Sequence, residues 1–168
     1  MAEHIFRTKN DYVITAMRLI LGIVFFAHGA QKALGWFGGP GFDGTLGMFS
    51  RMGIDEPLAA FAIAAEFLGG LGLIVGLLAR IAALGVTTNM LVAIMLVHRQ
   101  IGFFMNWSGN QAGEGFEFHL LAIALAIAIL VKGAGALSID RIIAASVARN
   151  HEVTAESRRA AQLRESGV

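Results

Sequence analysis

The sequence predicts an all-α integral membrane protein. Its expected core is a four-helix bundle, with a short interfacial helix in the first outer loop and a C-terminal cytoplasmic surface helix. Of the 168 residues, 56% are hydrophobic and only 15% are charged, and the mean hydropathy is +0.67. Soluble domains carry roughly 25% charged residues. The few charges are also segregated along the chain, and no stretch shows the alternating pattern of a β-strand.

Four long apolar stretches account for the transmembrane helices. They are expected at residues 12–34, 57–79, 81–97 and 116–131. Before the middle stretch is divided, the blocks 12–34, 57–97 and 116–131 contain five charged residues, which are Arg18, Lys32, Glu66, Arg80 and Glu117. A helix needs about 20 residues to cross a hydrocarbon core of ~30 Å. The stretch 57–97 is therefore too long for one span, and we divide it at Arg80.

The chain accordingly divides into three parts. Residues 1–11 are expected to form a cytoplasmic N-terminal tail, residues 12–137 the transmembrane domain, and residues 138–168 a cytoplasmic C-terminal helix and tail. Apolar side chains between Phe42 and Met52 predict the short helix on the membrane interface. Ser138 is a residue type that caps helix N-termini, which predicts where the C-terminal helix begins.

The distribution of Lys and Arg predicts the orientation. Nine of these residues lie in the N-terminal tail, at the turn near Arg80 and in the C-terminal region, against three on the other side. Both termini are therefore expected in the cytoplasm of a bacterium, with a multi-pass protein in its cytoplasmic (inner) membrane. The lipid bilayer is the expected partner, and a net charge of +1 gives no indication of nucleic acid. Because the chain has no Cys, a disulfide, a thiolate metal site and a dithiol motif are excluded.

Polar side chains gather near the outer ends of the predicted spans. They are His28, Gln31, Lys32, Glu66, His98, Glu117 and His119. Glu66 lies deepest, roughly 13–14 Å below the outer end of its helix at 1.5 Å per residue. Ionisable residues in a membrane are costly and usually face the bundle interior. We therefore expect one polar pocket near the periplasmic side.

The spacing within this set indicates which side chains share a face. His28, Gln31 and Lys32 lie on one stripe, because they are three and four residues apart. Glu117 and His119 lie about 200° apart around their helix, so both face inward only if the first turn is distorted. The candidate catalytic residues are His28, Glu66, His98, Glu117 and His119, with Glu117 as a proton acceptor. Gln31 and Lys32 are candidates for binding a cofactor. The alternative is that these groups bond to one another and hold the bundle together.

Several ligands suit these side chains. His and Glu ligate iron, copper or zinc, although no local spacing here defines a metal site. A His–carboxylate pair also accepts protons from a quinol or binds a quinone carbonyl. The apolar side chains of Phe25, Phe26, Phe103 and Phe104 would suit a quinone ring. A quinone is the expected cofactor, and a metal ion and haem remain open.

Four stretches resemble the DoxX family of bacterial membrane proteins. They are residues 18–32, residues 66–80, residues 95–98 and residues 133–140, and the resemblance covers about residues 12–143. It implies a four-helix protein of the cytoplasmic membrane. The family includes subunits resembling those of thiosulfate:quinone oxidoreductases, and others linked to membrane thiol and oxidative-stress complexes. Without Cys, a thiol relay through this chain's own residues is excluded.

Three functional hypotheses follow. The first is a redox-associated oxidoreductase subunit that binds a quinone and relays protons or electrons to a protein partner. The second is a non-catalytic accessory subunit of a larger respiratory or transport complex. The third is a transporter or lipid-handling protein, since a single intramembrane carboxylate is compatible with proton coupling. Four helices without an inverted repeat offer little basis for alternating access unless the protein is a homo-oligomer.

Overall fold

The computed structural model describes residue 6 and residues 8–165, and within this part of the chain it contains helices and no strands. The all-α class is therefore confirmed. The main helices are α2 (Tyr12–Leu34), α3 (Gly41–Arg51), α4 (Glu56–Val75), α5 (Ala79–Leu96), α6 (Glu117–Lys132) and α7 (Ile139–Glu165), with 3₁₀ turns η1 (Trp36–Gly38) and η2 (His98–Gln100). Helices α2, α4 and α5 are long and apolar enough to cross a membrane, whereas α6 has only 16 residues.

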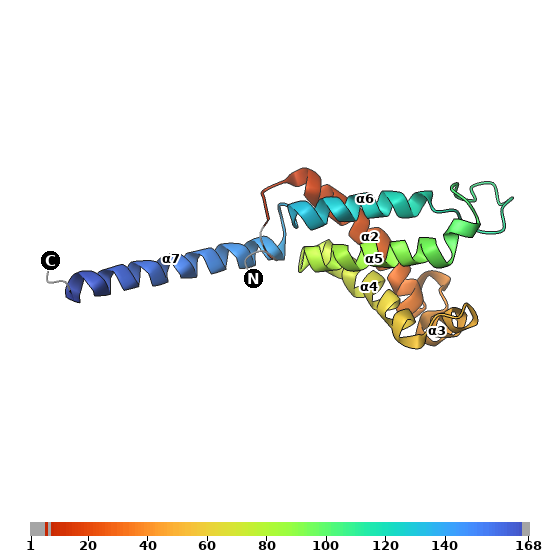
Figure 1. The fold of residues 1–168 in the computed structure, drawn as a ribbon, viewed down its shortest axis with the longest axis horizontal. Helices are drawn as coiled ribbons and strands as arrows, with labels where there is room; N and C mark the ends of the chain where they lie inside the picture. Colours follow the sequence, from red (N-terminus) through yellow and green to blue (C-terminus); the bar gives the residue numbers. More distant parts are fainter. Residues whose placement is uncertain (1–5, 7, 166–168) are drawn as a thin grey trace.

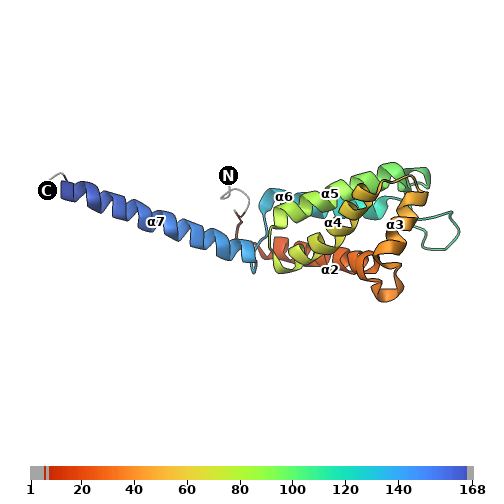
Figure 2. The same ribbon diagram turned by 90° about the horizontal axis from the view of Figure 1, so that it is seen from below.

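The four apolar helices pack as two pairs. Helix α2 lies along α4, and α5 lies along α6 (Figure 1). The α4–α5 connection joins the pairs, and α2 also contacts α6. Helix α3 crosses one end of this assembly against α2 and α4 (Figure 2). The molecule therefore has an α3 end and, opposite to it, an α7 end.

Helix α7 projects away from the packed helices (Figures 1 and 2). Its first turn is attached to the turn between α4 and α5, where the Asp140 backbone N–H donates to the Gly76 carbonyl at 2.9 Å. The Ser138 hydroxyl accepts from the Arg141 backbone N–H at 3.3 Å, the bond predicted for an N-cap. Beyond this root, α7 does not pack extensively on another helix of the described chain. It therefore extends outward instead of lying across the end of the other helices.

The sequence placed the break between these helices at Arg80, but α4 ends at Val75 and α5 begins at Ala79, so Arg80 lies in the first turn of α5. Gly76 (φ 69°) ends α4 in the left-handed conformation common after helices, and Leu78 (φ 51°), the residue before α5, is left-handed as well. The Asp140 carboxylate accepts the backbone N–H groups of Leu78 (2.7 Å) and Ala79 (2.9 Å). These two bonds satisfy amide groups at the beginning of α5 that have no partner within the helix.

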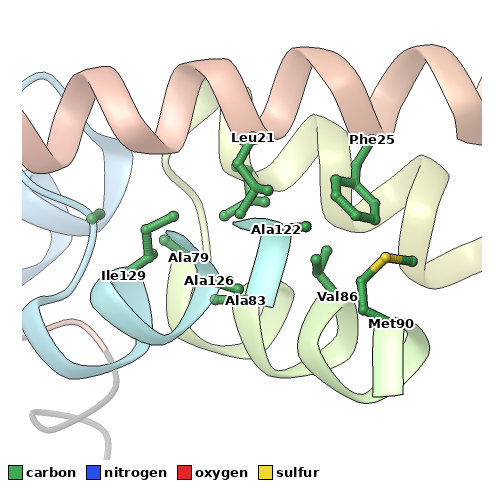
Figure 3. Packing of buried hydrophobic residues seen from close by; sticks show 11 residues of the cluster. Leu21, Phe25, Ala79, Ala83, Val86, Met90, Ala122, Ala126 and Ile129 are labelled. Atoms are coloured by element: carbon green, nitrogen blue, oxygen red, sulfur yellow. The ribbon is translucent and has the colours of Figure 1, made fainter. Parts of the chain in front are cut away.

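Small and branched side chains fill the centre of the molecule. Leu21 and Phe25 extend from α2 toward α5 and α6 (Figure 3). They meet side chains of these two helices, which are Ala79, Ala83, Val86, Met90, Ala122, Ala126 and Ile129. The alanines recur at four-residue spacing, so that α5 and α6 can approach closely.

Helices α2 and α4 approach each other most closely through glycines. A Cβ on Gly70 would lie only 2.4 Å from the backbone nitrogen of Phe26. We expect Gly70→Ala to push α2 from α4 and to lower the free energy of unfolding by about 1–3 kcal/mol. The matched control is Gly69→Ala, whose new methyl group would have its nearest neighbour at 3.9 Å. Equal stability of the two variants in detergent-induced unfolding, followed by circular dichroism, would contradict this packing.

Candidate functional site

A cavity of about 530 Å³ lies between the two helix pairs at the α3 end. Helices α2, α4, α5 and α6 all contribute to its walls, which are mainly apolar, and Met48 and Phe49 of α3 cover part of it. Five of the seven predicted site residues line this one cavity, namely His28, Lys32, Glu66, His98 and His119. The structure therefore brings together side chains from four helical elements that lie far apart in the sequence.

Glu66 is the centre of the first polar cluster. It is only 5% exposed. Lys32 on α2 forms an ion pair with Oε2 of Glu66, and Asn89 on α5 donates from Nδ2 to Oε1 at 2.9 Å. Both carboxylate oxygens therefore have partners inside the protein. The cluster also connects the two helix pairs, because α4 belongs to one pair and α5 to the other.

Asn89 is a cavity residue that the predicted site did not include. Its position nine residues before His98 placed the two side chains on opposite sides of an ideal helix. Both nevertheless line the cavity, because α5 ends at Leu96 and His98 lies in the 3₁₀ turn η2, so the ideal-helix angle does not apply. The available signal was an amide side chain in an otherwise apolar span, which is costly unless it has a partner.

An imidazole pair forms the second polar cluster. The rings of His98 and His119 lie with their centroids 4.1 Å apart and their planes tilted by 44°. The loop between α5 and α6 holds His98 in place, because Nδ1 of His98 lies 2.7 Å from the carbonyl oxygen of Glu114. His119 is 6% exposed, and its Nδ1 has no hydrogen-bond partner within the described residues. A buried polar atom without a partner is costly, so a ligand that bonds to it would gain free energy.

Aromatic side chains close the cavity between α2 and α6. The rings of Phe25 and Phe118 stack with their centroids 6.5 Å apart. The ring of His28 meets Phe118 edge-on at 6.4 Å. This wall places flat apolar rings beside the imidazole of His28, which can both donate and accept a hydrogen bond.

Glu117 and Gln31 do not line the cavity. Oε1 of Glu117 accepts from the backbone N–H of Met105 (2.9 Å) and from Nε1 of Trp107 (3.2 Å), so its side chain holds the loop between α5 and α6. The expected opposition between Glu117 and His119 thus places only His119 in the cavity. Gln31 instead packs against Gly39 in the turn after α2. The structure gives neither residue the pocket position that the sequence predicted.

Within the described chain, no group of three or more His, Cys, Asp or Glu side chains is placed to hold a metal ion. The polar side chains of the cavity form two clusters. One is the Lys32–Glu66 ion pair with the amide of Asn89, and the other is the pair of imidazole rings. Such groups can orient a ligand through hydrogen bonds and can donate or accept protons.

Comparison with known proteins gives two matches. The family model described as DoxX matches residues 13–99, which is more than half of the chain. The chain is also 28% identical over 127 residues to the protein of Bacillus subtilis (strain 168) named "Putative oxidoreductase CatD", and the alignment covers 76% of this chain and 84% of that protein. No solved structure matches it significantly. The matched residues 13–99 include Asn89 and four of the five predicted site residues that line the cavity. The fifth, His119, lies beyond the matched range.

Proposed function

This chain belongs to the DoxX family of membrane proteins, and on that premise we propose that it is a redox-associated protein that binds a quinone in the cavity between its helix pairs. The name of the Bacillus subtilis relative supports the redox assignment. The orientation is proposed from the charge distribution, with both termini in the cytoplasm and the cavity in the outer half of the bacterial inner membrane.

The observation that carries this proposal is the free Nδ1 of His119 in a largely apolar cavity. A quinone consists of a flat apolar ring with two carbonyl oxygens, which accept hydrogen bonds. The aromatic wall suits the ring, and a protonated Nδ1 of His119 suits one of the oxygens. The Lys32 ammonium keeps two further hydrogens beyond its bond to Glu66, and these suit a carbonyl oxygen as well.

The chemistry at the ring requires both protons and electrons. Reduction of a quinone to a quinol consumes two electrons and two protons, and oxidation releases them. In our proposal His98 and His119 pass these protons to and from the quinone oxygens, because an imidazole ring carries both a donor and an acceptor nitrogen. The two electrons pass to or from a redox protein partner in the membrane. A purely accessory role would not require a ligand in the cavity, so quinone binding separates the two functions.

We expect His119→Ala to weaken quinone binding at least about tenfold, which corresponds to 1.4 kcal/mol and to the loss of one hydrogen bond to a buried group. The measurement is titration of the purified protein in lipid nanodiscs with a short-chain ubiquinone analogue. His151→Ala is the matched control, because it removes the same side chain from the exposed surface of α7. Equal affinities of the wild type and His119→Ala would contradict the proposal.

A further inference from the structure

We infer that the cavity receives its ligand sideways from the bilayer, through an opening between α4 and α5, and that the ligand is a quinone with a long hydrocarbon tail that lies in this opening. The inference rests on the proposed function, and it specifies the class of quinone and the route of entry. We call this gap the α4–α5 opening. We define its rim as the exposed residues of α4 and α5 that line the cavity, which are Leu58, Phe61, Thr88 and Leu96.

The two helices touch at one end and separate at the other. Near the α4–α5 turn the packing is close, since a Cβ on Gly85 would lie 3.6 Å from Cβ of Ala65 and one on Gly69 would lie 3.9 Å from Ala82. Beyond this contact, α4 turns away from α5 toward the α3 end (Figure 1). The hydrogen bond between Glu66 and Asn89 lies where the separation begins, and the cavity follows.

The rim of the opening is apolar and exposed. Leu58, Phe61 and Leu96 are 42%, 53% and 48% exposed, although all three line the cavity. The cavity wall is therefore continuous with the outer surface of α4 and α5. Both helices are candidate membrane spans, so this surface faces the hydrocarbon of a bilayer. A hydrocarbon chain is the chemistry that fits such a rim.

On three other sides of the cavity, hydrogen bonds or stacked rings fix the wall in place. The Thr45 hydroxyl of α3 is buried and lies within hydrogen-bond distance of the carbonyl oxygens of Gly41 (2.7 Å) and Lys32 (3.2 Å), which seats α3 on the end of α2. Glu117 holds the loop between α5 and α6. The stacked rings of Phe25 and Phe118 occupy the α2–α6 side. None of these three closures involves a residue of the exposed rim.

The size of the cavity agrees with a ligand that is only partly enclosed. A volume of about 530 Å³ holds a drug-sized molecule. That is enough for a substituted quinone ring and the first part of a tail. A tail of several isoprene units must continue outside, and the α4–α5 opening leads it into the bilayer.

The natural absence of Cys allows a direct test. A single Phe61→Cys variant in nanodiscs is labelled with pyrene maleimide, which places a bulky apolar group on the rim. Binding is then measured for ubiquinone-10 and for its tail-free form, ubiquinone-0, as the quinone-to-lipid ratio at half saturation. Leu121→Cys is the matched control, because this side chain is 68% exposed on α6 and does not line the cavity.

The label on Phe61→Cys is expected to weaken ubiquinone-10 binding at least tenfold and ubiquinone-0 binding less than twofold. The label on Leu121→Cys should change neither. A Leu96→Cys variant repeats the measurement from α5 in case Phe61→Cys alters folding. The inference is overturned if the rim label weakens both quinones equally or weakens neither. Failure of ubiquinone-0 to bind the unlabelled protein would instead contradict the proposed function itself.

Discussion

Replacing Arg18 with Leu is expected to lower the free energy of unfolding by about 3–5 kcal/mol, the usual cost of breaking a buried charged network. Arg18 is 1% exposed. Its guanidinium donates to the carbonyl oxygens of Ala134 (2.8 Å), Ile74 (2.9 Å) and Leu137 (3.1 Å), and also to that of Leu73. One side chain thus joins α2 to the end of α4 and to the segment after α6. Its loss leaves these acceptors without a donor.

The measurement is equilibrium unfolding in mixed detergent micelles, followed by circular dichroism. Arg18→Lys is expected to lie between the wild type and Arg18→Leu, because Lys keeps the charge but loses the planar fork of donors. Arg149→Leu, on the exposed surface of α7, is the matched control and should change stability little. A loss below 1 kcal/mol for Arg18→Leu would contradict the role assigned to this network.

The deficit of Arg18→Leu should also depend on pH through Asp140. Burial raises the pKa of the Asp140 carboxyl, while its bonds to the Ala79 and Leu78 amides and the charges of Arg18 and Arg80 oppose the increase. Without Arg18 this opposition weakens, so the folded-state pKa rises further. A raised carboxyl pKa destabilises the folded state at higher pH. The deficit should therefore shrink as the pH falls through that pKa toward the ordinary Asp value of about 3.9.

Replacing Glu66 with Leu is expected to lower stability by roughly 1–3 kcal/mol and to weaken quinone binding at least tenfold. The variant leaves Lys32 and Asn89 without their shared acceptor inside the cavity. The lower part of the stability range is expected, because the Lys32 side chain is 25% exposed and water can reach it. Binding falls because the ammonium loses the carboxylate that orients it toward the ring.

A second substitution distinguishes the two effects. In Lys32→Leu/Glu66→Leu no unpaired charge remains, so stability should recover relative to Glu66→Leu alone, since apolar replacement of a whole buried ion pair is often neutral. Quinone binding should not recover. Glu66→Gln keeps an acceptor for Asn89 and should lose less stability than Glu66→Leu. Wild-type affinity in Glu66→Leu would contradict the role of this cluster in binding.

The sequence predicted elements best where the signal is local. Asp11 accepts the backbone N–H groups of Val13 and Ile14, and α2 begins directly after it at Tyr12, as the apolar pattern indicates. The depth of each polar residue follows from its distance to a helix end, and five of the seven candidates do line one cavity. Fixed rise per residue makes such arithmetic possible.

Features that depend on distant contacts could not be predicted. The α4–α5 turn is stabilised by Asp140, which lies about sixty residues later in the sequence, so the apolar pattern located the break only to within a few residues. Neighbouring apolar residues did not resolve the facing of Glu66, which depends on how α4 crosses α2 and α5. The 200° between Glu117 and His119 indicated that only one faces inward. The choice between them depends on the loop that Glu117 holds.

The contacts of Arg18 have a consequence for biogenesis. Two of its carbonyl acceptors belong to residues 73 and 74, but the other two belong to residues 134 and 137. A ribosome adding roughly 5–20 residues per second needs on the order of ten seconds to travel from the first helix to these last acceptors. During that interval the guanidinium lacks half of its partners. Although α2 is translated early, it is therefore among the last helices to reach its final position.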